Sequence, residues 1–223
     1  MARILAIDTT SGYGSLALLE DDRVLEERPM PSADGYGHVL FPQIEDLLAS
    51  HGWGLHTVEC FAAAAGPGSF TGIRVGLAAV KGLGEALGKP VCAVSNLQAL
   101  AFYGRTPLRA PFIDARRGEV YGALYSAELA PLMPETVLPP EQWLAKLPHE
   151  EVELIGADFS CLEAVLQAIS RPGVLRTAAP RWLASAIGRI AALCLAAGQV
   201  GEAAAAEANY VRRSDAELFS KPL

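Results

Sequence analysis

Eleven residues form the most informative stretch of this chain: Gly66-Pro67-Gly68-Ser69-Phe70-Thr71-Gly72-Ile73-Arg74-Val75-Gly76. Before them, Cys60 to Ala65 is a short apolar run of the length and composition typical of a buried strand. After them, Gly72 to Gly88 has its apolar side chains at helical spacing. The stretch therefore predicts a glycine loop between a strand and a helix, with Ser69 or Thr71 capping the helix.

The chemistry of this loop is less defined than its geometry. A helix N-terminus can bind an anion, because its first backbone N–H groups have no partner within the helix. The loop nevertheless lacks the Gly-Lys-Ser/Thr ending of a Walker A motif and the G-x-G-x-x-G pattern of dinucleotide-binding folds. It also lacks the G-x-S-x-G pattern of a nucleophile elbow, since Phe70 and Thr71 separate Ser69 from Gly72. Phosphate binding is permitted but not indicated, and no catalytic residue is expected here.

A second pattern, at residues 3–19, is repeated more weakly at residues 110–125. In each copy a strand ends in Ile-Asp, at Asp8 or Asp114, and a short turn leads into another apolar run. Strand, turn and returning strand are the signature of a β-hairpin. The sequence therefore predicts two halves, each of which opens with a hairpin.

These segments resemble the TsaB (YeaZ) family, the non-catalytic partners in threonylcarbamoyl-adenosine modification of tRNA. The resemblance covers most of the chain, although Ala208 stands where the family usually has proline. It implies an α/β, actin-like (RNase H-like, ASKHA) two-lobed fold with mixed sheets flanked by helices. The segments that carry it are Ile7-Asp8-Thr9-Thr10, His38 to Leu48, Gly66 to Gly76, Phe112 to Arg116, and Tyr210-Val211-Arg212.

The chain is expected to divide at the turn Gly104-Arg105-Thr106-Pro107 into an N-terminal lobe, residues 1–103, and a C-terminal lobe, residues 104–223. Five prolines between Ala130 and Pro148 predict an irregular excursion with at most a short helix near residues 141–146. In the first lobe, strands are expected near residues 3–8, 14–19, 23–30, 60–65 and 90–95, and helices near 38–51, 72–88 and 96–103. In the second lobe, strands are expected near residues 109–114, 119–126 and 152–156, and helices near 160–169 and 181–197.

Composition and charge limit the function further. The net charge is −7, and the pairs Arg116-Arg117 and Arg212-Arg213 are isolated, so the chain alone is expected to bind tRNA poorly. The four cysteines are widely spaced within apolar runs and are interpreted as reduced core residues. No signal peptide and no membrane span are expected, which favours a cytoplasmic protein.

A nucleotide site is the first candidate for function. In actin-like ATPases a carboxylate at the end of the first strand holds the metal, and the corresponding residues here are Asp8 and Thr9, with Gly66, Gly68 and Ser69 in the glycine loop. The second phosphate turn would be Asp114 to Gly118, where bulky arginines leave little room for a phosphate. The competing interpretation, which we favour, is that Asp8 and Asp114 are turn residues that bond their own backbone. No bound cofactor is expected.

Metal chemistry lacks its ligands. The catalytic relatives of the resembled family carry paired histidines on one helix, but this chain has no H-x-x-x-H or H-E-x-x-H motif. A zinc or iron site usually needs three protein ligands. His38, at the start of the first helix, is therefore assigned to helix entry or an interface, and no metal site is expected.

The helix that follows the glycine loop has an unusually broad apolar surface. Its only charged residues, Arg74, Lys81 and Glu85, fall within a stripe of roughly 40°, so two separate covers are expected. Interior glycines each cost about 1 kcal/mol and suggest that another backbone comes close. A neighbouring helix of the same lobe is one possible cover, and a partner protein is the other. The partner interface predicted from this face and from the resemblance comprises His38, Phe41, Gly72, Gly76, Ala79, Val80 and Leu83.

The expected function is that of a scaffold and activating subunit for threonylcarbamoyl transfer to the adenosine beside the tRNA anticodon. The resemblance implies a catalytic paralogue (TsaD-like) as partner, an ATPase subunit (TsaE-like), and tRNA contact only through the complex. A homodimer is expected when the chain is alone. The alternative is a degenerate, sugar-kinase-like ATPase acting alone through Asp8 and the glycine loop.

Overall fold

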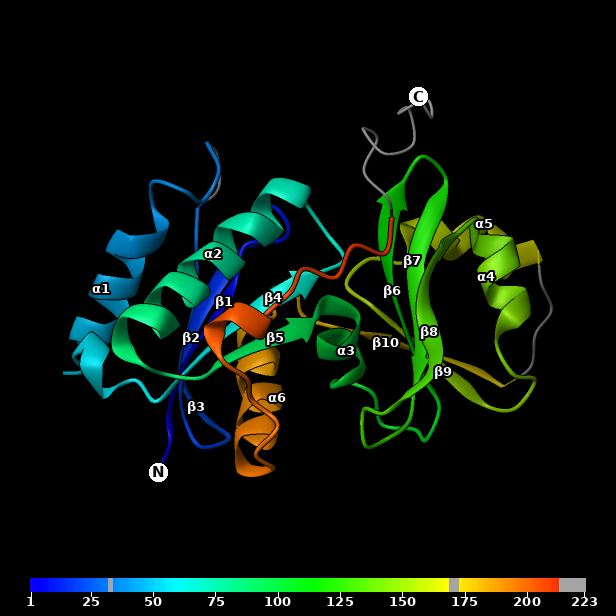
Figure 1. The fold of residues 1–223 in the computed structure, drawn as a ribbon. Coiled ribbons are helices and arrows are strands. Elements are labelled where there is room, and N and C mark those ends of the chain that lie inside the picture. Colours follow the sequence, from blue (N-terminus) through cyan, green and yellow to red (C-terminus); the bar gives the residue numbers. More distant parts are fainter. Residues whose placement is uncertain (32–33, 169–172, 213–223) are drawn as a thin grey trace, which may run out of the picture. The chain divides into compact units, whose positions relative to one another are not determined.

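Two five-stranded mixed sheets organise the chain (Figure 1). The computed structural model describes residues 1–31, 34–168 and 173–212. Unit 1 combines Met1–Ala99 with Pro180–Ala208, and unit 2 combines Leu100–Ala179 with the chain from Asn209 onward. Each unit contains one of the sheets.

The sheet of unit 1 has the strand order β3-β2-β1-β4-β5. Strands β1, β4 and β5 run parallel, and β2 and β3 are antiparallel neighbours on the other side of β1. All residues of β4 and nearly all of β1 are buried, which explains their continuous apolar sequences. The strands are β1 (Arg3–Asp8), β2 (Ser15–Glu20), β3 (Arg23–Pro29), β4 (Cys60–Gly66) and β5 (Val91–Ser95).

Helices cover both faces of this sheet. Helices α1 (Leu40–Ser50) and α2 (Phe70–Leu87) pack into one core with Leu5, Ile7 and Leu16. Helix α6 (Ala184–Ala196) lies on the opposite face, where Gly188 meets Leu19, because successive strand residues point to opposite sides. Figure 1 shows α1 and α2 side by side and α6 on the other side of the strands.

The sheet of unit 2 repeats the same connectivity, with the order β10-β9-β6-β7-β8. Its core packs Phe112 against Trp143 and Leu154. The strands are β6 (Arg109–Arg116), β7 (Glu119–Tyr125), β8 (Pro131–Leu138), β9 (Val152–Gly156) and β10 (Val174–Ala178). The remaining helices are α3 (Asn96–Ala101), α4 (Pro140–Lys146) and α5 (Ser160–Ala168), with 3₁₀ turns η1 (Leu55–Thr57) and η2 (Ala203–Ala205).

The expected α/β actin-like fold, with mixed sheets flanked by helices, is confirmed. Two strands were not predicted. Strand β8 forms where the prolines predicted an irregular excursion, and it accommodates Pro131 and Pro134 because it is an edge strand, where missing N–H groups are tolerated. Strand β10 is the other edge of the same sheet and pairs in parallel with β9.

The two units differ from the expected lobes at one segment. The first boundary lies between Ala99 and Leu100, near the expected turn at 104–107, but residues 180–208 fold with unit 1. Helix α6 belongs there because it buries Ile187, Gly188 and Ile190 when it packs on the first sheet. Residues 213–223 of the expected C-terminal lobe, and residue 169 of the expected helix 160–169, lie outside the described residues.

Candidate functional site

The residues predicted to hold a nucleotide meet at the carboxyl end of the first sheet. Asp8 ends β1, Gly66 ends β4, and Asn96 follows β5 directly. These three strands are parallel neighbours, so their ends lie along one edge. In open α/β sheets this edge is the usual place for a ligand.

Asp8 bonds to its own turn through one carboxylate oxygen. Its Oδ1 accepts hydrogen bonds from the backbone N–H of Thr10 at 2.9 Å and from Thr10 Oγ1 at 2.6 Å. Asn96 Nδ2 donates to the same hydroxyl at 2.7 Å, and Asn96 Oδ1 accepts from the N–H of Gly66 at 2.9 Å. Burial raises the pKa of Asp8, the Thr10 hydrogen bonds lower it less, and the nearby Glu27 raises it further. This chain of contacts links the ends of the three parallel strands.

The sequence interpretation included Asp8 but missed Thr10 and Asn96 as its supports. An asparagine placed directly after a buried strand was the available signal, since such residues often bond to neighbouring loops. Thr10 is 3% exposed and Asn96 2% exposed, so both hydrogen-bonding side chains are inside the protein. Their role is to hold the glycine loop against the end of β1.

The glycine loop lies directly on the Thr9–Thr10 backbone. The N–H of Ser69 donates to the carbonyl of Thr10 at 2.7 Å, and Thr9 Oγ1 donates to the carbonyl of Gly72 at 2.7 Å. A Cβ added to Gly68 would come within 2.6 Å of the Thr10 carbonyl oxygen, and one added to Gly72 would overlap the carbonyl oxygen of Thr9. These glycines therefore allow a close approach of the chain's own backbone.

Of the two predicted caps, Ser69 is the N-cap of α2, which begins at Phe70, two residues before the expected start. Ser69 Oγ accepts a hydrogen bond from the N–H of Gly72 at 3.3 Å. The structure thus brings Asp8, Thr9, Gly68 and Ser69 together, but the polar groups of Asp8, Thr9 and Ser69 bond to Thr10 and Gly72. The arrangement fixes where α2 starts.

The second predicted turn has a comparable structural role in unit 2. Asp114 Oδ1 accepts from the N–H of Arg116 at 2.7 Å, as the turn interpretation of Asp114 proposed. Arg116 and Arg117 both have positive φ angles, 62° and 56°, at the tip of the β6–β7 hairpin. Arg212 donates to the Ala115 carbonyl at 2.9 Å, so the C-terminal segment is attached to this turn. Arg213, the other member of that pair, lies outside the described residues.

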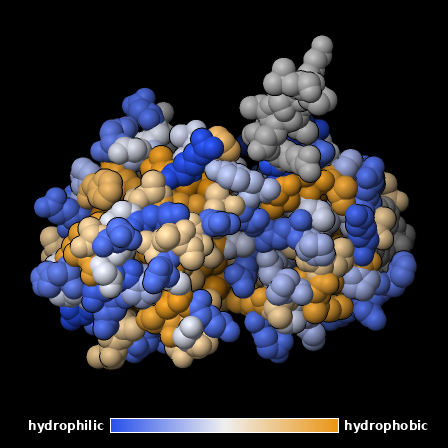
Figure 2. All heavy atoms as spheres, in the orientation of Figure 1, coloured by the Kyte–Doolittle hydropathy of each residue, from blue (hydrophilic) through white to orange (hydrophobic). Residues whose placement is uncertain are grey.

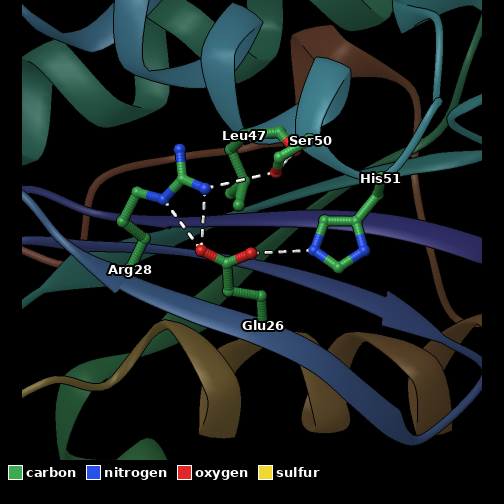
Figure 3. Close-up of polar contacts among 5 residues, drawn as sticks. All are labelled: Glu26, Arg28, Leu47, Ser50 and His51. Atoms are coloured by element: carbon green, nitrogen blue, oxygen red, sulfur yellow. Dashed lines mark hydrogen bonds and ion pairs between the residues drawn. The ribbon is translucent and has the colours of Figure 1, made fainter.

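Among the described residues, no group of three or more His, Cys, Asp or Glu side chains is arranged to hold a metal ion. His38 is exposed in the turn before α1, which begins at Leu40. His51 follows α1, and its Nε2 lies 2.8 Å from Glu26 Oε2 (Figure 3). Arg28 contacts the other oxygen of Glu26 and also Ser50. The His51 hydrogen bond is the main cause that lowers the pKa of Glu26, and the cluster ties β3 to the end of α1.

The four cysteines are free thiols. Cys60 and Cys92 are buried, as expected, whereas Cys161 and Cys194 are only partly buried. Burial raises the pKa of Cys60 to about 12, so this thiol is protonated and unreactive at neutral pH.

Four residues of the predicted partner interface are buried inside unit 1, which does not favour their assignment to an interface: Gly72, Gly76, Ala79 and Val80. They face the sheet, where a Cβ on Gly76 would come within 2.6 Å of Thr9 Oγ1. Phe41 is 53% exposed, His38 is exposed and Leu83 is half-buried. The glycines of α2 near the loop are explained by Thr9 rather than by a partner.

The second cover predicted for α2 is partly supplied by the chain itself. Residues 201–206, termed the strap, lie along the C-terminal half of α2 and bury Ala203 and Ala206. Lys81 Nζ donates to the carbonyls of Ala204 and Ala206 at 3.2 and 3.0 Å, and the N–H of Val91 donates to Gly201 at 3.0 Å. After the strap is placed, the exposed positions of α2 are Phe70, Thr71, Arg74, Ala78, Gly82, Glu85 and Ala86.

None of the helices in the described part of the chain has the length and hydropathy needed to cross a membrane.

Comparisons with known proteins agree with this architecture. A family model described as TsaD, tRNA N6-adenosine threonylcarbamoyltransferase, matches residues 28–208. The chain is 33% identical to the tRNA threonylcarbamoyladenosine biosynthesis protein TsaB of Bacillus subtilis over 79% of this chain and 80% of that protein. It is also 33% identical to the Escherichia coli protein of the same name, over 70% and 69% of the two chains.

Solved structures give the same result. YeaZ from Pseudomonas aeruginosa superposes with a TM-score of 0.78 at 32% identity, covering 94% of this chain and all of that one. A second Pseudomonas aeruginosa structure, described as similar to peptidase YEAZ, has a TM-score of 0.79 at 30% identity and covers 95% of this chain. Each of these four similarities spans more than two thirds of both chains.

Proposed function

Because this chain belongs to the TsaB (YeaZ) family, we propose that it is a non-catalytic subunit that binds and activates a TsaD-like catalytic paralogue in tRNA threonylcarbamoyladenosine biosynthesis. The relatives are named as biosynthesis proteins of this modification. The matching family model carries the name of the transferase, which fits a pair of related chains that act together. In this function the paralogue performs the transfer to tRNA.

One observation supports a partner more than any other: an exposed face remains on α1 and α2 after the strap has covered its part. Phe41 is 53% exposed, and Ala78 and Gly82 are exposed small residues on α2. Small residues let a partner helix come close, and an exposed phenylalanine provides apolar contact area. Figure 2 shows hydrophobic patches broken by hydrophilic side chains over this region, a mixture found in interfaces between proteins that also exist apart.

We assign the contact to Phe41, His38, Ala78, Gly82 and Leu83. The four buried residues of the expected interface are not included. The free chain uses the same face to form a homodimer, with which the paralogue competes. A TsaE-like ATPase completes the assembly. tRNA is held mainly by the other subunits, because the chain carries a net charge of −7.

The burial and hydrogen bonding of Asp8 support a chain without catalytic activity of its own. A metal–nucleotide site would need an accessible Asp8, but this side chain is 1% exposed and its Oδ1 accepts two hydrogen bonds from Thr10. An ATPase acting alone is therefore the weaker proposal. Micromolar ATP binding with turnover by the isolated chain, lost in a folded Asp8→Ala variant, would support that alternative instead.

The interface is tested with a matched pair of substitutions, Ala78→Glu on α2 and Ala196→Glu on α6. Both alanines are exposed, but α6 lies on the other face of the sheet. Burying an unpaired carboxylate costs several kcal/mol, so Ala78→Glu should weaken the complex with the paralogue by about 100-fold or more. Ala196→Glu should leave it unchanged. Size-exclusion chromatography and calorimetry measure binding, and tRNA modification by the reconstituted subunits measures activation.

Two results would contradict the proposal. The first is a paralogue complex of equal affinity with both variants, because the exposed face would then not be the contact. The second is full tRNA modification by the paralogue and ATPase without this chain.

A further inference from the structure

Two arginine–aromatic stacks lie at the carboxyl end of the first sheet, near the glycine loop. The Arg181 guanidinium lies over the Tyr13 ring, 4.6 Å from its centroid, and also hydrogen-bonds to the Tyr13 hydroxyl. Arg74 lies 3.7 Å from the centroid of the Phe70 ring. The turn that carries Tyr13 and the start of α2, which carries Phe70, are joined by the hydrogen bond from the N–H of Ser69 to the Thr10 carbonyl.

The rings of these stacks are open to solvent. Tyr13 is 45% exposed and Phe70 is 43% exposed. Trp182, which follows Arg181 in the chain, is 43% exposed. Exposed aromatic side chains gathered on segments that are joined to one another are typical of an interaction site. We refer to Tyr13, Phe70, Arg74, Arg181 and Trp182 as the aromatic edge.

The backbone beneath Tyr13 is held in place. The Tyr36 hydroxyl accepts from the N–H of Gly14 at 2.7 Å and donates to the Ser11 carbonyl at 2.7 Å. Tyr36 itself is only 6% exposed, so this anchor is internal. On the other side, the N–H of Ala184 donates to Ser15 Oγ at 3.2 Å, which attaches the Arg181 segment to the same hairpin. The aromatic edge is therefore organised before any partner arrives.

The charge of the segments that form the aromatic edge differs from that of the whole chain. Residues 9–14, 66–76 and 180–186 contain two arginines and no aspartate or glutamate, although the whole chain has 25 acidic residues. Asp8 is 1% exposed and Glu27 is half-buried, whereas Asp34, in the segment that carries Tyr36, is exposed. Both oxygens of Glu27 accept hydrogen bonds from Ser15 and Ser185, so this group is internally satisfied.

The geometry points to RNA: the aromatic edge stacks unpaired bases of the tRNA substrate and contacts the adjoining phosphates with its arginines. Exposed rings and guanidinium planes are the groups on which splayed bases stack. The two arginines of these segments supply the positive charge that attracts phosphates. This inference rests on the proposed function, which makes tRNA the substrate of the complex. The edge adds affinity within the complex, while the isolated chain binds only weakly.

The first test uses the complex of this chain with its catalytic paralogue. Labelled tRNA is titrated by fluorescence anisotropy with wild type, Tyr13→Ala, Trp182→Ala and Arg181→Gln. Each aromatic variant should weaken tRNA binding by about 10-fold, because a stacked base contributes that much or more. Arg181→Gln should also lower the slope of log K against log salt by roughly one phosphate contact. Leu193→Ala, an exposed residue further along α6, is the matched control and should have no effect.

The second test uses the isolated chain and does not depend on a partner. Trp53 is 8% exposed and Trp143 is fully buried, so Trp182 is the accessible tryptophan. A single-stranded RNA oligonucleotide at concentrations up to about 1 mM should quench its fluorescence, and an RNA duplex of the same length should not, since its bases are already stacked. Trp182→Phe should remove the quenched signal.

The outcomes separate this inference from the proposed function. Failure of the paralogue complex to form would contradict the proposed function, and the quenching test would still decide the inference. Equal tRNA affinity of wild type and the three variants, in an intact complex, would overturn the inference. If the variants disrupt the protein complex while quenching by single-stranded and duplex RNA is equal, the aromatic edge is a protein contact and the inference is also wrong.

Discussion

Gly72→Ala and Gly82→Ala are the same substitution in the same helix, and the structure predicts opposite effects on stability. Gly72 lies under the carbonyl of Thr9, which an added Cβ would overlap, and the Thr9 carbonyl carbon would be 2.9 Å away. Gly82 is exposed and has no atom within 4 Å of an added Cβ. The pair therefore separates the cost of close packing from the general effect of glycine on a helix.

The magnitude follows from the contacts that must change at Gly72. The obstacle is backbone, so α2 and the Thr9–Thr10 loop must move apart, and overpacking of this kind costs about 1–3 kcal/mol. The movement also strains the hydrogen bond from Thr9 Oγ1 to the Gly72 carbonyl and the Ser69 cap, at about 1 kcal/mol each. Alanine returns about 1 kcal/mol of helix propensity. The net expected loss is about 2–4 kcal/mol, whereas Gly82→Ala should gain about 0.5–1 kcal/mol.

Urea denaturation followed by circular dichroism measures both effects, with the m-value as a check that the unfolding transition is unchanged. The reasoning is refuted if Gly72→Ala has the stability of wild type within about 0.5 kcal/mol, or if the two substitutions shift the midpoint in the same direction by similar amounts. Either result would mean that the loop adjusts freely to α2. The glycine would then need another explanation, such as a partner's backbone.

Three further predictions concern single side chains. Burial raises the pKa of Asp8 in the folded state above its ordinary value of 3.8, so the protonated carboxyl stabilises the fold at pH values below 3.8. This stabilisation is lost as the pH rises through the folded-state pKa, because the buried group must then ionise. Thermal unfolding should therefore show that Asp8→Asn gains stability relative to wild type between about pH 4 and 7. Glu26 has its pKa lowered from 4.5, chiefly by His51, so its contribution is present above that pH and lost on acidification; Glu26→Gln should cost about 0.5 kcal/mol at pH 7, and this difference should vanish at low pH. Lys81→Met removes two hydrogen bonds to the strap and should accelerate hydrogen exchange of the strap amides, with unchanged exchange in β1 as the control.

Local patterns were sufficient for most elements of the first sheet. Strand β4, the glycine loop, the Ser69 cap and helix α2 are adjacent in the chain, so each constrains the next. The hairpin repeat also implied that both halves share one topology. If the repeat is extended to the whole sheet, β8 is the counterpart of β3 and β10 is the counterpart of β5. Neither strand has a clear strand pattern in the sequence, because β8 contains prolines and β10 is short and polar.

The position of the candidate nucleotide site was predicted, and the turn interpretation favoured for Asp8 agrees with its hydrogen bond from the N–H of Thr10. The sequence placed Asp8 and the glycine loop at strand ends, which the parallel sheet then brought together. The sequence did not reveal that Thr10 bonds to Asp8 and that Asn96 bonds to Thr10 and Gly66, because Asn96 is 86 residues from Thr10 in the chain. Contacts over that separation depend on strand order, which hydropathy periodicity does not contain.

The sequence by itself determined that α2 has an apolar circumference too wide for one cover. Only the tertiary structure decided what the covers are: Thr9 under Gly72 and Gly76, the sheet under Val80, and the strap over the C-terminal half. The physical reason is that periodicity records how much of a helix avoids water, not which segment excludes it. Lys81 illustrates the limit, because its ammonium group belongs to a solvent stripe in the sequence pattern but binds the carbonyl of Ala206, 125 residues later in the chain.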